Sequence, residues 1–115
     1  MGTMASPTVL SAVHGSNGKV VTLSIAGSAS YATGGDTFDL STATIGIDGG
    51  FAIVNDISGG SDGGVFAVRF DRAASGAPAT TKLVIYSAAV ADGGDEVSNA
   101  TDLSAQTFYL TIHGR

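Results

Sequence analysis

The chain has 115 residues, and its composition excludes several classes of protein before any motif is considered. It contains no Cys, which excludes a disulfide scaffold and any metal site with thiolate ligands. With 43% hydrophobic and only 13% charged residues, it does not have the composition of a disordered chain. No apolar run reaches the roughly 18 residues of a membrane-spanning helix, so we expect one compact domain and no membrane partner.

The net charge is −5, from ten acidic and five basic residues. Nucleic-acid-binding proteins cluster Lys and Arg to neutralise phosphates, whereas the basic residues of this chain are scattered. We therefore expect no nucleic-acid partner. A charge fraction this low predicts a surface of small uncharged residues, which cost little to desolvate and can pack closely on another protein. Residues 1–13 have no basic residue and no long apolar run, so they lack the pattern of a secretory signal.

Apolar and polar residues alternate in several short runs, which is the pattern of half-buried β-strands. In chain order, the expected strands cover residues 8–13, 19–26, 36–40, 51–57, 65–72, 81–88 and 106–113. Asn17-Gly18 and a series of Gly-Gly pairs are interpreted as the joints between strands, because Gly and Asn adopt tight-turn conformations at low cost. The pairs are at 34–35, 49–50, 59–60, 63–64 and 93–94.

About seven short antiparallel strands with frequent turns predict an all-β fold. The expected form is a single compact β-sandwich or a small β-barrel, and a jelly-roll-like arrangement is one version of it. We place this domain at residues 18–115 and interpret residues 1–17 as an arm or a flexible start. The chain has five Phe, which we expect in the core, and no Trp. We expect such a light core to gain stability when the chain forms oligomers.

Residues suited to catalysis are few. His14 and His113 are the only imidazoles, one just before a predicted turn and the other two residues from the end. No Gly-x-Ser-x-Gly nucleophile motif occurs. The Gly-rich stretch at 59–64 lacks the Lys-Ser/Thr ending of a phosphate-binding loop, and we interpret it as a hairpin tip. The sequence therefore predicts neither enzymatic activity nor a cofactor.

Three carboxylates lie within five residues, at Asp92, Asp95 and Glu96. Calcium takes six to eight oxygen ligands, which acidic Gly-rich loops can supply. The full helix-loop-helix calcium motif is missing, and turn chemistry alone explains acidic residues beside glycines. The sequence predicts no metal site and leaves open whether these three carboxylates bind a cation.

The tyrosines allow two readings. Tyr86 and Tyr109 lie on the strand faces opposite the predicted core, and Tyr31 lies just before a Gly-Gly turn. Exposed tyrosines stack on sugars in carbohydrate-binding β-sandwiches, and they also give large contact areas at protein interfaces. The absence of Trp favours the protein interface, with a carbohydrate-binding or adhesion module as the alternative.

Two segments resemble a known family. Residues 31–36, YATGGD, followed by TFDLS at 37–41, are similar to a segment of small structural proteins in the heads of tailed bacteriophages, where a strand ending in Tyr turns through Gly-Gly into a short segment that contains Leu. The dipeptide EV at 96–97 and TDLSA at 101–105, followed by an apolar strand that closes on Gly114-Arg115, resemble the usual ending of these chains.

The resemblance implies a capsid decoration, or cement, protein. Such a protein is a β-rich module, often a homotrimer, that sits at junctions between capsomers and has no catalytic residues. Its partner would be the major capsid protein, and its place would be the exterior of the virion capsid after synthesis in the host cytoplasm. A decoration protein binds the assembled shell and not loose subunits, and it thereby stabilises the assembled state.

The interface residues are expected on exposed strand faces and tips, where aromatic residues and Arg are favoured. The expected residues are Tyr31, Phe38, Arg69, Arg72, Tyr86 and Tyr109, together with the segment 8–13. The alternative function places the same tyrosines in a carbohydrate-binding or adhesion module displayed on a virion.

Overall fold

The computed structural model describes residues 4, 7–15, 18–41, 50–71, 78–87 and 95–115. These residues contain seven strands: β1 (Thr8–Gly15), β2 (Gly18–Ala26), β3 (Asp36–Phe38), β4 (Val54–Ser61), β5 (Phe66–Phe70), β6 (Thr81–Ser87) and β7 (Thr107–Gly114). Two short 3-10 turns are also present. η2 (Asp62–Gly64) follows β4, and η3 (Pro78–Thr80) precedes β6.

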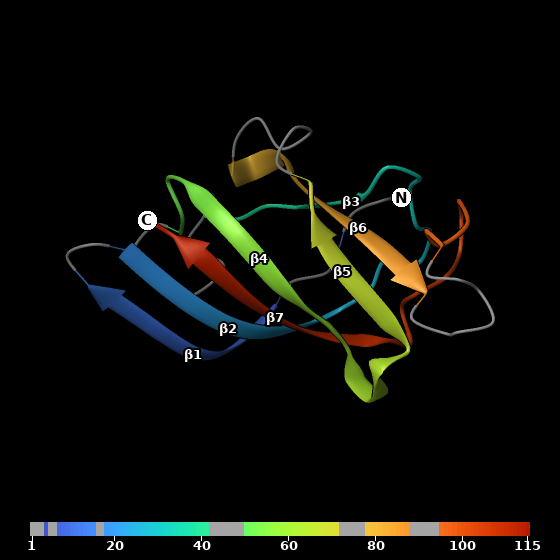
Figure 1. The fold of residues 1–115 in the computed structure, drawn as a ribbon, viewed down its shortest axis with the longest axis horizontal. Helices are drawn as coiled ribbons and strands as arrows, with labels where there is room; N and C mark the ends of the chain where they lie inside the picture. The colour runs from blue at the N-terminus through green and yellow to red at the C-terminus, as the bar shows by residue number, and fades with distance from the viewer. Residues whose placement is uncertain (1–3, 5–6, 16–17, 42–49, 72–77, 88–94) are drawn as a thin grey trace.

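All seven strands belong to one antiparallel sheet in the order β1-β2-β7-β4-β5-β6-β3. The sheet curls into a half-barrel, with β1 and β2 at the lower left of the view and β5 and β6 at its right (Figure 1). The predicted all-β class and the number of strands are therefore confirmed. A single curled sheet of this kind is compatible with both the expected small barrel and the expected sandwich.

Alternate residues of two neighbouring interior strands, β2 and β7, fill the inner face of the curled sheet, as their alternation predicted. Leu23 and Leu110 are direct neighbours in the register, and both are fully buried. Burying one such side chain stabilises the fold by about 1.5–3 kcal/mol relative to leaving it exposed. The buried apolar residues of the two strands are Val21, Leu23, Ile25, Phe108, Leu110 and Ile112.

Segments between the strands supply further residues of this core: Tyr31, Leu40, Phe51, Val97 and Leu103. Met4 is also buried, and its backbone N–H donates a hydrogen bond to the carbonyl oxygen of Thr37 at 3.1 Å. Residue 4 therefore lies beside β3, although the strand that follows it, β1, is at the other end of the strand order.

Residues 8–15 of the segment expected to be an arm form β1, which pairs with β2 through a register shift between Val9 and Ser11. Only Val9 of this strand is partly buried, and every other residue of β1 is exposed. Residues 16 and 17, the turn predicted from Asn17-Gly18, lie outside the described residues. β1 is thus an edge strand that contributes little to the core.

The Gly-Gly pair at 59–60 lies inside β4 and not at a joint, which corrects the expected end of this strand. Gly59 is needed there because a Cβ atom on it would lie 2.1 Å from the carbonyl oxygen of Tyr109 on the neighbouring strand. The chain turns at η2 instead, where Gly63 and Gly64 have φ angles of 81° and 70°. Of the other predicted joints, residues 49 and 93–94 lie outside the described part of the chain.

Candidate functional site on the outer face of the sheet

The turn at residues 31–36 is held from within by Asp36, which is 1% exposed. Its carboxylate accepts hydrogen bonds from the hydroxyl of Ser28 at 2.6 Å and from the backbone N–H of Ala32 at 3.0 Å. Gly34 and Gly35 have φ angles of 94° and 124°, a conformation that side chains disfavour. The GGD part of the YATGGD segment therefore specifies the turn geometry.

Tyr31 fixes this turn to the late part of the chain. Its hydroxyl donates a hydrogen bond to the carboxylate of Glu96 at 2.6 Å and accepts one from the backbone N–H of Ile85 at 3.1 Å. Burial, together with the hydrogen bond to Glu96, raises the pKa of Tyr31 well above its usual value. The same carboxylate accepts a hydrogen bond from the N–H of Gly34 at 2.8 Å, so the segments at 31–41 and 96–105 contact each other.

Asp-Leu-Ser occurs once in each of these two segments, at 39–41 and 102–104, and forms the same local structure both times. Asp39 accepts hydrogen bonds from the N–H and the hydroxyl of Ser41 at 2.9 and 2.7 Å, and these bonds lower the pKa of Asp39. Asp102 accepts the equivalent bonds from Ser104 at 2.9 and 2.6 Å, with the same effect on its pKa. The leucine of each tripeptide is buried in the core, so both motifs are structural.

Two of the expected interface residues are buried, which corrects their predicted exposure. Tyr31 is 1% exposed because its ring packs in the core while its hydroxyl reaches Glu96. Phe38 is 3% exposed because β3 pairs with β6 in a register that turns its side chain inward. Arg72 lies outside the described residues.

The other three expected residues, Arg69, Tyr86 and Tyr109, lie on the face of the sheet opposite the core, which we call the outer face. The strand register aligns Tyr109 with Gly60, Gly60 with Ala67, and Ala67 with Tyr86. These four residues form one line across β7, β4, β5 and β6, the tyrosine row. Neighbouring strands are about 4.8 Å apart, so the two tyrosine backbones are separated by roughly 14 Å.

Arg69 stands beside the tyrosine row and contacts Tyr86. Its Nε atom donates a hydrogen bond to the Tyr86 hydroxyl at 3.2 Å, and its guanidinium carbon is 5.8 Å from the centre of the Tyr86 ring. The hydrogen bond to Tyr86 raises the pKa of Arg69 further above neutrality. At the other end of the row, Tyr109 is 45% exposed. The structure thus places the Arg69–Tyr86 pair and Tyr109 together on the outer face of the sheet.

A second line of aligned residues crosses the outer face from β1 to β4 and carries only hydroxyl side chains. The register aligns Ser11 with Thr22, Thr22 with Thr111, and Thr111 with Ser58. We call this line the hydroxyl row. It lies two residues from Tyr109 along β7, so a line of uncharged hydroxyl side chains adjoins the tyrosine row.

The two histidines belong to neither the tyrosine row nor the hydroxyl row. His14 and His113 are both exposed, and His113 is aligned with Val20 and Asp56 at one end of the outer face. Among the described residues, no group of three or more His, Asp or Glu side chains is placed to hold a metal ion. Asp92, one of the three carboxylates considered for a cation, lies outside this part of the chain.

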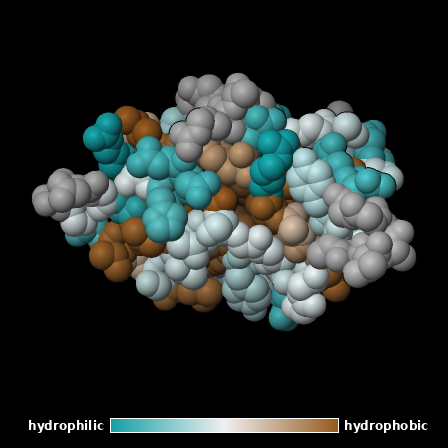
Figure 2. Space-filling view, in the orientation of Figure 1, coloured by the Kyte–Doolittle hydropathy of each residue, from teal (hydrophilic) through white to brown (hydrophobic). Residues whose placement is uncertain are grey.

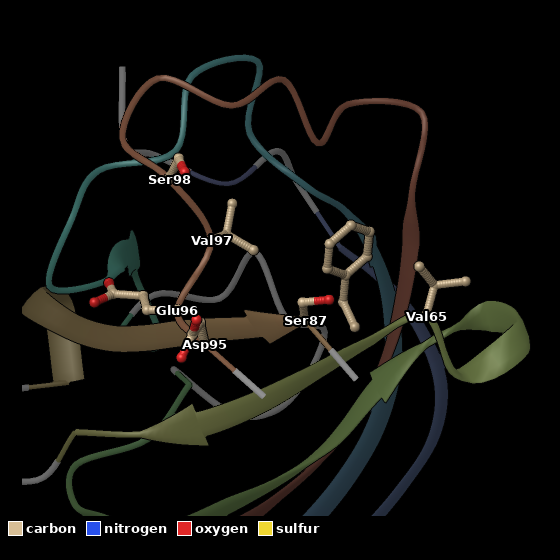
Figure 3. Close-up of a pocket in the computed structure, with 7 residues that line it drawn as sticks. Val65, Ser87, Asp95, Glu96, Val97 and Ser98 are labelled. Atoms are coloured by element: carbon tan, nitrogen blue, oxygen red, sulfur yellow. The ribbon is translucent and has the colours of Figure 1, made fainter. Parts of the chain in front are cut away.

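A pocket of about 460 Å³ lies where β5 begins and β6 ends, beside the segment that carries Asp95 and Glu96. Figure 3 shows the Glu96 side chain pointing away from Val65 and Ser87, consistent with its hydrogen bonds to the 31–36 turn. Its lining mixes apolar groups, hydroxyls and carboxylates: Val65, Phe66, Ser87, Asp95, Glu96, Val97 and Ser98. Because Glu96 is hydrogen-bonded to the turn, Asp95 is the remaining carboxylate among the described residues that line the pocket.

Gly60 and Ala67, which form the floor between the two tyrosines, were not recognised as site residues from the sequence. Their position follows from the strand order, because β7 is inserted between β2 and β4. Alternation places Tyr109 and Tyr86 on outward faces, but no local signal aligns residue 109 with residue 60. The pairing of distant strands is what creates the row.

In the described part of the chain, no helix is long and apolar enough to cross a membrane. Comparison of the sequence and the structure with known proteins gave no match to a protein-family model, to a curated protein or to a solved structure.

Proposed function

We propose that this chain is a structural protein that docks through the outer face of its sheet on a larger protein assembly. The observation that carries the proposal is the tyrosine row, in which Tyr109 and the Arg69–Tyr86 pair stand on one face with Gly60 and Ala67 between them. Tyr and Arg are the residue types enriched among the main contributors to protein interfaces.

The surroundings of the row favour a protein partner. The small residues Gly60 and Ala67 let a partner backbone approach the sheet closely between the two tyrosines. The neighbouring hydroxyl row bears no charge, so covering it requires no buried charge to be compensated. Its hydroxyls can each donate or accept a hydrogen bond. A partner surface would therefore be bound by aromatic contacts at the two tyrosines and by hydroxyls beside the tyrosine row.

More specifically, we propose a capsid decoration protein of a tailed bacteriophage, bound to the major capsid protein on the exterior of the head. The resemblance of residues 31–41 and 96–105 to such proteins supports this assignment. The hydrogen bond between Tyr31 and Glu96 adds to that support, because it makes the two segments one structural unit. A protein with this role needs no catalytic centre, and its effect on the head follows from mass action.

The test uses heads of the phage whose genome encodes the chain, prepared without the chain. The purified protein is mixed with expanded heads, the heads are sedimented, and their melting temperature is measured with and without it. We expect the protein to sediment with the heads and to raise their melting temperature. Absence of binding would overturn the proposal.

Variants connect the result to the outer face. Tyr109→Ala and the double change Arg69→Ala with Tyr86→Ala are expected to weaken binding by about tenfold or more, the loss typical of residues that dominate an interface. Ile53→Ala is the matched control, because Ile53 is 44% exposed, as Tyr109 is 45% exposed, and lies outside the tyrosine row. Equal loss in all variants would contradict docking through the row.

The alternative, a carbohydrate-binding or adhesion module displayed on a virion, gives a different result in the same set of variants. Such a module would bind defined glycans on an array, and Tyr86→Ala and Tyr109→Ala would weaken that signal. Glycan binding without head binding would replace the proposed function by this alternative.

A further inference from the structure

We propose that the protein docked on the outer face supplies a carboxylate, from an Asp or Glu side chain, that pairs with the guanidinium group of Arg69. This inference rests on the proposed docking function and deepens it, because it names the chemistry of the partner at one point of the interface. Arg69 then selects the partner, whereas the tyrosines supply contact area.

The first support is the position in which Tyr86 holds Arg69. The Nε atom of Arg69 donates a hydrogen bond of 3.2 Å to the Tyr86 hydroxyl, and the guanidinium carbon is 5.8 Å from the centre of the Tyr86 ring. These contacts orient the guanidinium and use neither Nη1 nor Nη2. The N–H groups of these two nitrogens lie in one plane and match the two oxygens of a carboxylate, which they can bind at the same time.

The second support is that no carboxylate in the described part of this chain forms an ion pair with Arg69. Asp71 and Glu96 act on Arg69 only by through-space attraction. The carboxylate of Glu96 is hydrogen-bonded to the 31–36 turn instead. The place beside Nη1 and Nη2 is therefore not taken by a carboxylate of the described residues.

The third support is the free energy that it costs to cover an unpaired charge. Arg69 is exposed and stands beside the tyrosine row, so docking through this row removes water from its guanidinium. A charge taken out of water without a counter-charge is strongly destabilising, and a guanidinium cannot avoid this by losing its proton. The partner must therefore offset the charge, and a carboxylate offers both a negative charge and two acceptor oxygens.

The surroundings of Arg69 confine this requirement to one point. The register aligns Arg69 with Val84, which is 2% exposed, and neither the tyrosine row nor the hydroxyl row contains a charged residue. Figure 2 shows strongly hydrophilic surface over the upper end of β5 and pale, weakly polar surface below it. A partner thus meets an isolated positive group, roughly 7 Å along β5 from the tyrosine row.

The first experiment detects the partner carboxylate directly. Arg69→Lys places an amine at this position, and a carbodiimide joins an amine to an adjacent carboxylate as an amide while it takes up the water released. The variant is bound to the phage heads described above, treated with carbodiimide and analysed by peptide mass spectrometry. We expect a cross-link from position 69 to an Asp or Glu of the major capsid protein.

Ile53→Lys is the matched control for this cross-link, because Ile53 is 44% exposed and lies outside both rows. It should give no cross-link to the head. A cross-link from both lysine variants, or bound Arg69→Lys that gives none, would overturn the inference.

The second experiment measures affinity for the heads. Arg69→Lys should bind about tenfold more weakly, because Lys keeps the charge but loses the paired hydrogen bonds. Arg69→Glu should bind at least about a hundredfold more weakly, because it sets like charges against each other. Arg115→Glu changes the net charge equally at another exposed position and should bind as the wild type does. Equal losses in the two Glu variants would assign the effect to net charge and contradict the inference.

The two proposals fail in different ways. If Tyr109→Ala loses head binding while Arg69→Lys and Arg69→Glu bind as the wild type does, docking through the outer face stands and the paired carboxylate is wrong. Heads that bind no form of the chain would overturn both.

Discussion

The hydroxyl of Tyr31 donates a hydrogen bond of 2.6 Å to the carboxylate of Glu96, which lies 65 residues further along the chain. The same carboxylate accepts the N–H of Gly34, and the same hydroxyl accepts the N–H of Ile85. Three segments therefore meet at two side chains. This small network, and not an exposed recognition loop, is what the conspicuous YATGGD segment encodes.

The first prediction concerns this network. Glu96→Ala removes the acceptor of two hydrogen bonds and leaves the buried Tyr31 hydroxyl without its partner. We expect the free energy of unfolding to fall by about 1–3 kcal/mol, measured by urea denaturation. Asp95→Ala is the control, because this exposed neighbour contributes no side-chain hydrogen bond to the turn among the bonds described above. A similar loss in both variants would show that the network contributes no specific stability.

The second prediction concerns alkaline pH and follows from the raised pKa of Tyr31. The folded state holds the neutral phenol, so its pKa lies above the value of 10.0 expected for an unperturbed tyrosine. The stability from this shift is therefore complete below pH 10 and declines as the pH rises above the unfolded-state pKa. We expect unfolding free energy to decrease above about pH 10 and the slope to be smaller in Tyr31→Phe. An identical slope in the two proteins would contradict the burial of an un-ionised phenol.

The third prediction concerns the stability of the fold at acidic pH. Hydrogen bonds from Ser41 and Ser104 lower the pKa values of Asp39 and Asp102 below the usual value of 3.8. Because the folded pKa is the lower one, the stabilising effect is present above pH 3.8 and is lost as the pH falls through the folded value. Asp39→Asn with Asp102→Asn should give a shallower loss of stability in an acid titration. If the double variant responds to acid as the wild type does, the two Asp-Leu-Ser turns have no electrostatic role.

The fourth prediction concerns the close contact between β4 and β7. Gly59→Ala would place a Cβ atom 2.1 Å from the carbonyl oxygen of Tyr109, at a φ angle of 147°. We expect a destabilisation of several kcal/mol, since both overlap and backbone strain oppose the change. Gly63→Ala separates these causes, because Gly63 also has a positive φ of 81° but no atom within 4 Å of the added Cβ. Its cost should be limited to strain, about 1–2 kcal/mol, and equal costs would argue against the close strand contact.

The alternation of residues along β2, β5 and β7 was enough to predict the fold class and the inward faces of these strands. The same local pattern correctly placed Tyr86 and Tyr109 outward. It failed for Phe38, because a three-residue strand carries too few alternating positions to show which face is buried. It failed for Tyr31, which lies outside any strand and is buried by contacts with Glu96 and Ile85, both more than fifty residues away.

Gly59-Gly60 shows a second limit of sequence patterns. A Gly pair predicts a turn because Gly tolerates unusual backbone angles, but the same residue also serves where another strand passes too closely for a side chain. Only the order of the strands distinguishes the two uses. That order also produces the tyrosine row, in which Gly60 and Ala67 lie between Tyr109 of β7 and Tyr86 of β6.

The proposed docking of the outer face on a phage head can be examined by electron cryomicroscopy of heads incubated with the purified chain. We expect density for the chain on the exterior of the shell, with Tyr109, Arg69 and Tyr86 facing the major capsid protein. Density in which these residues face solvent, or heads that carry no added density, would contradict it.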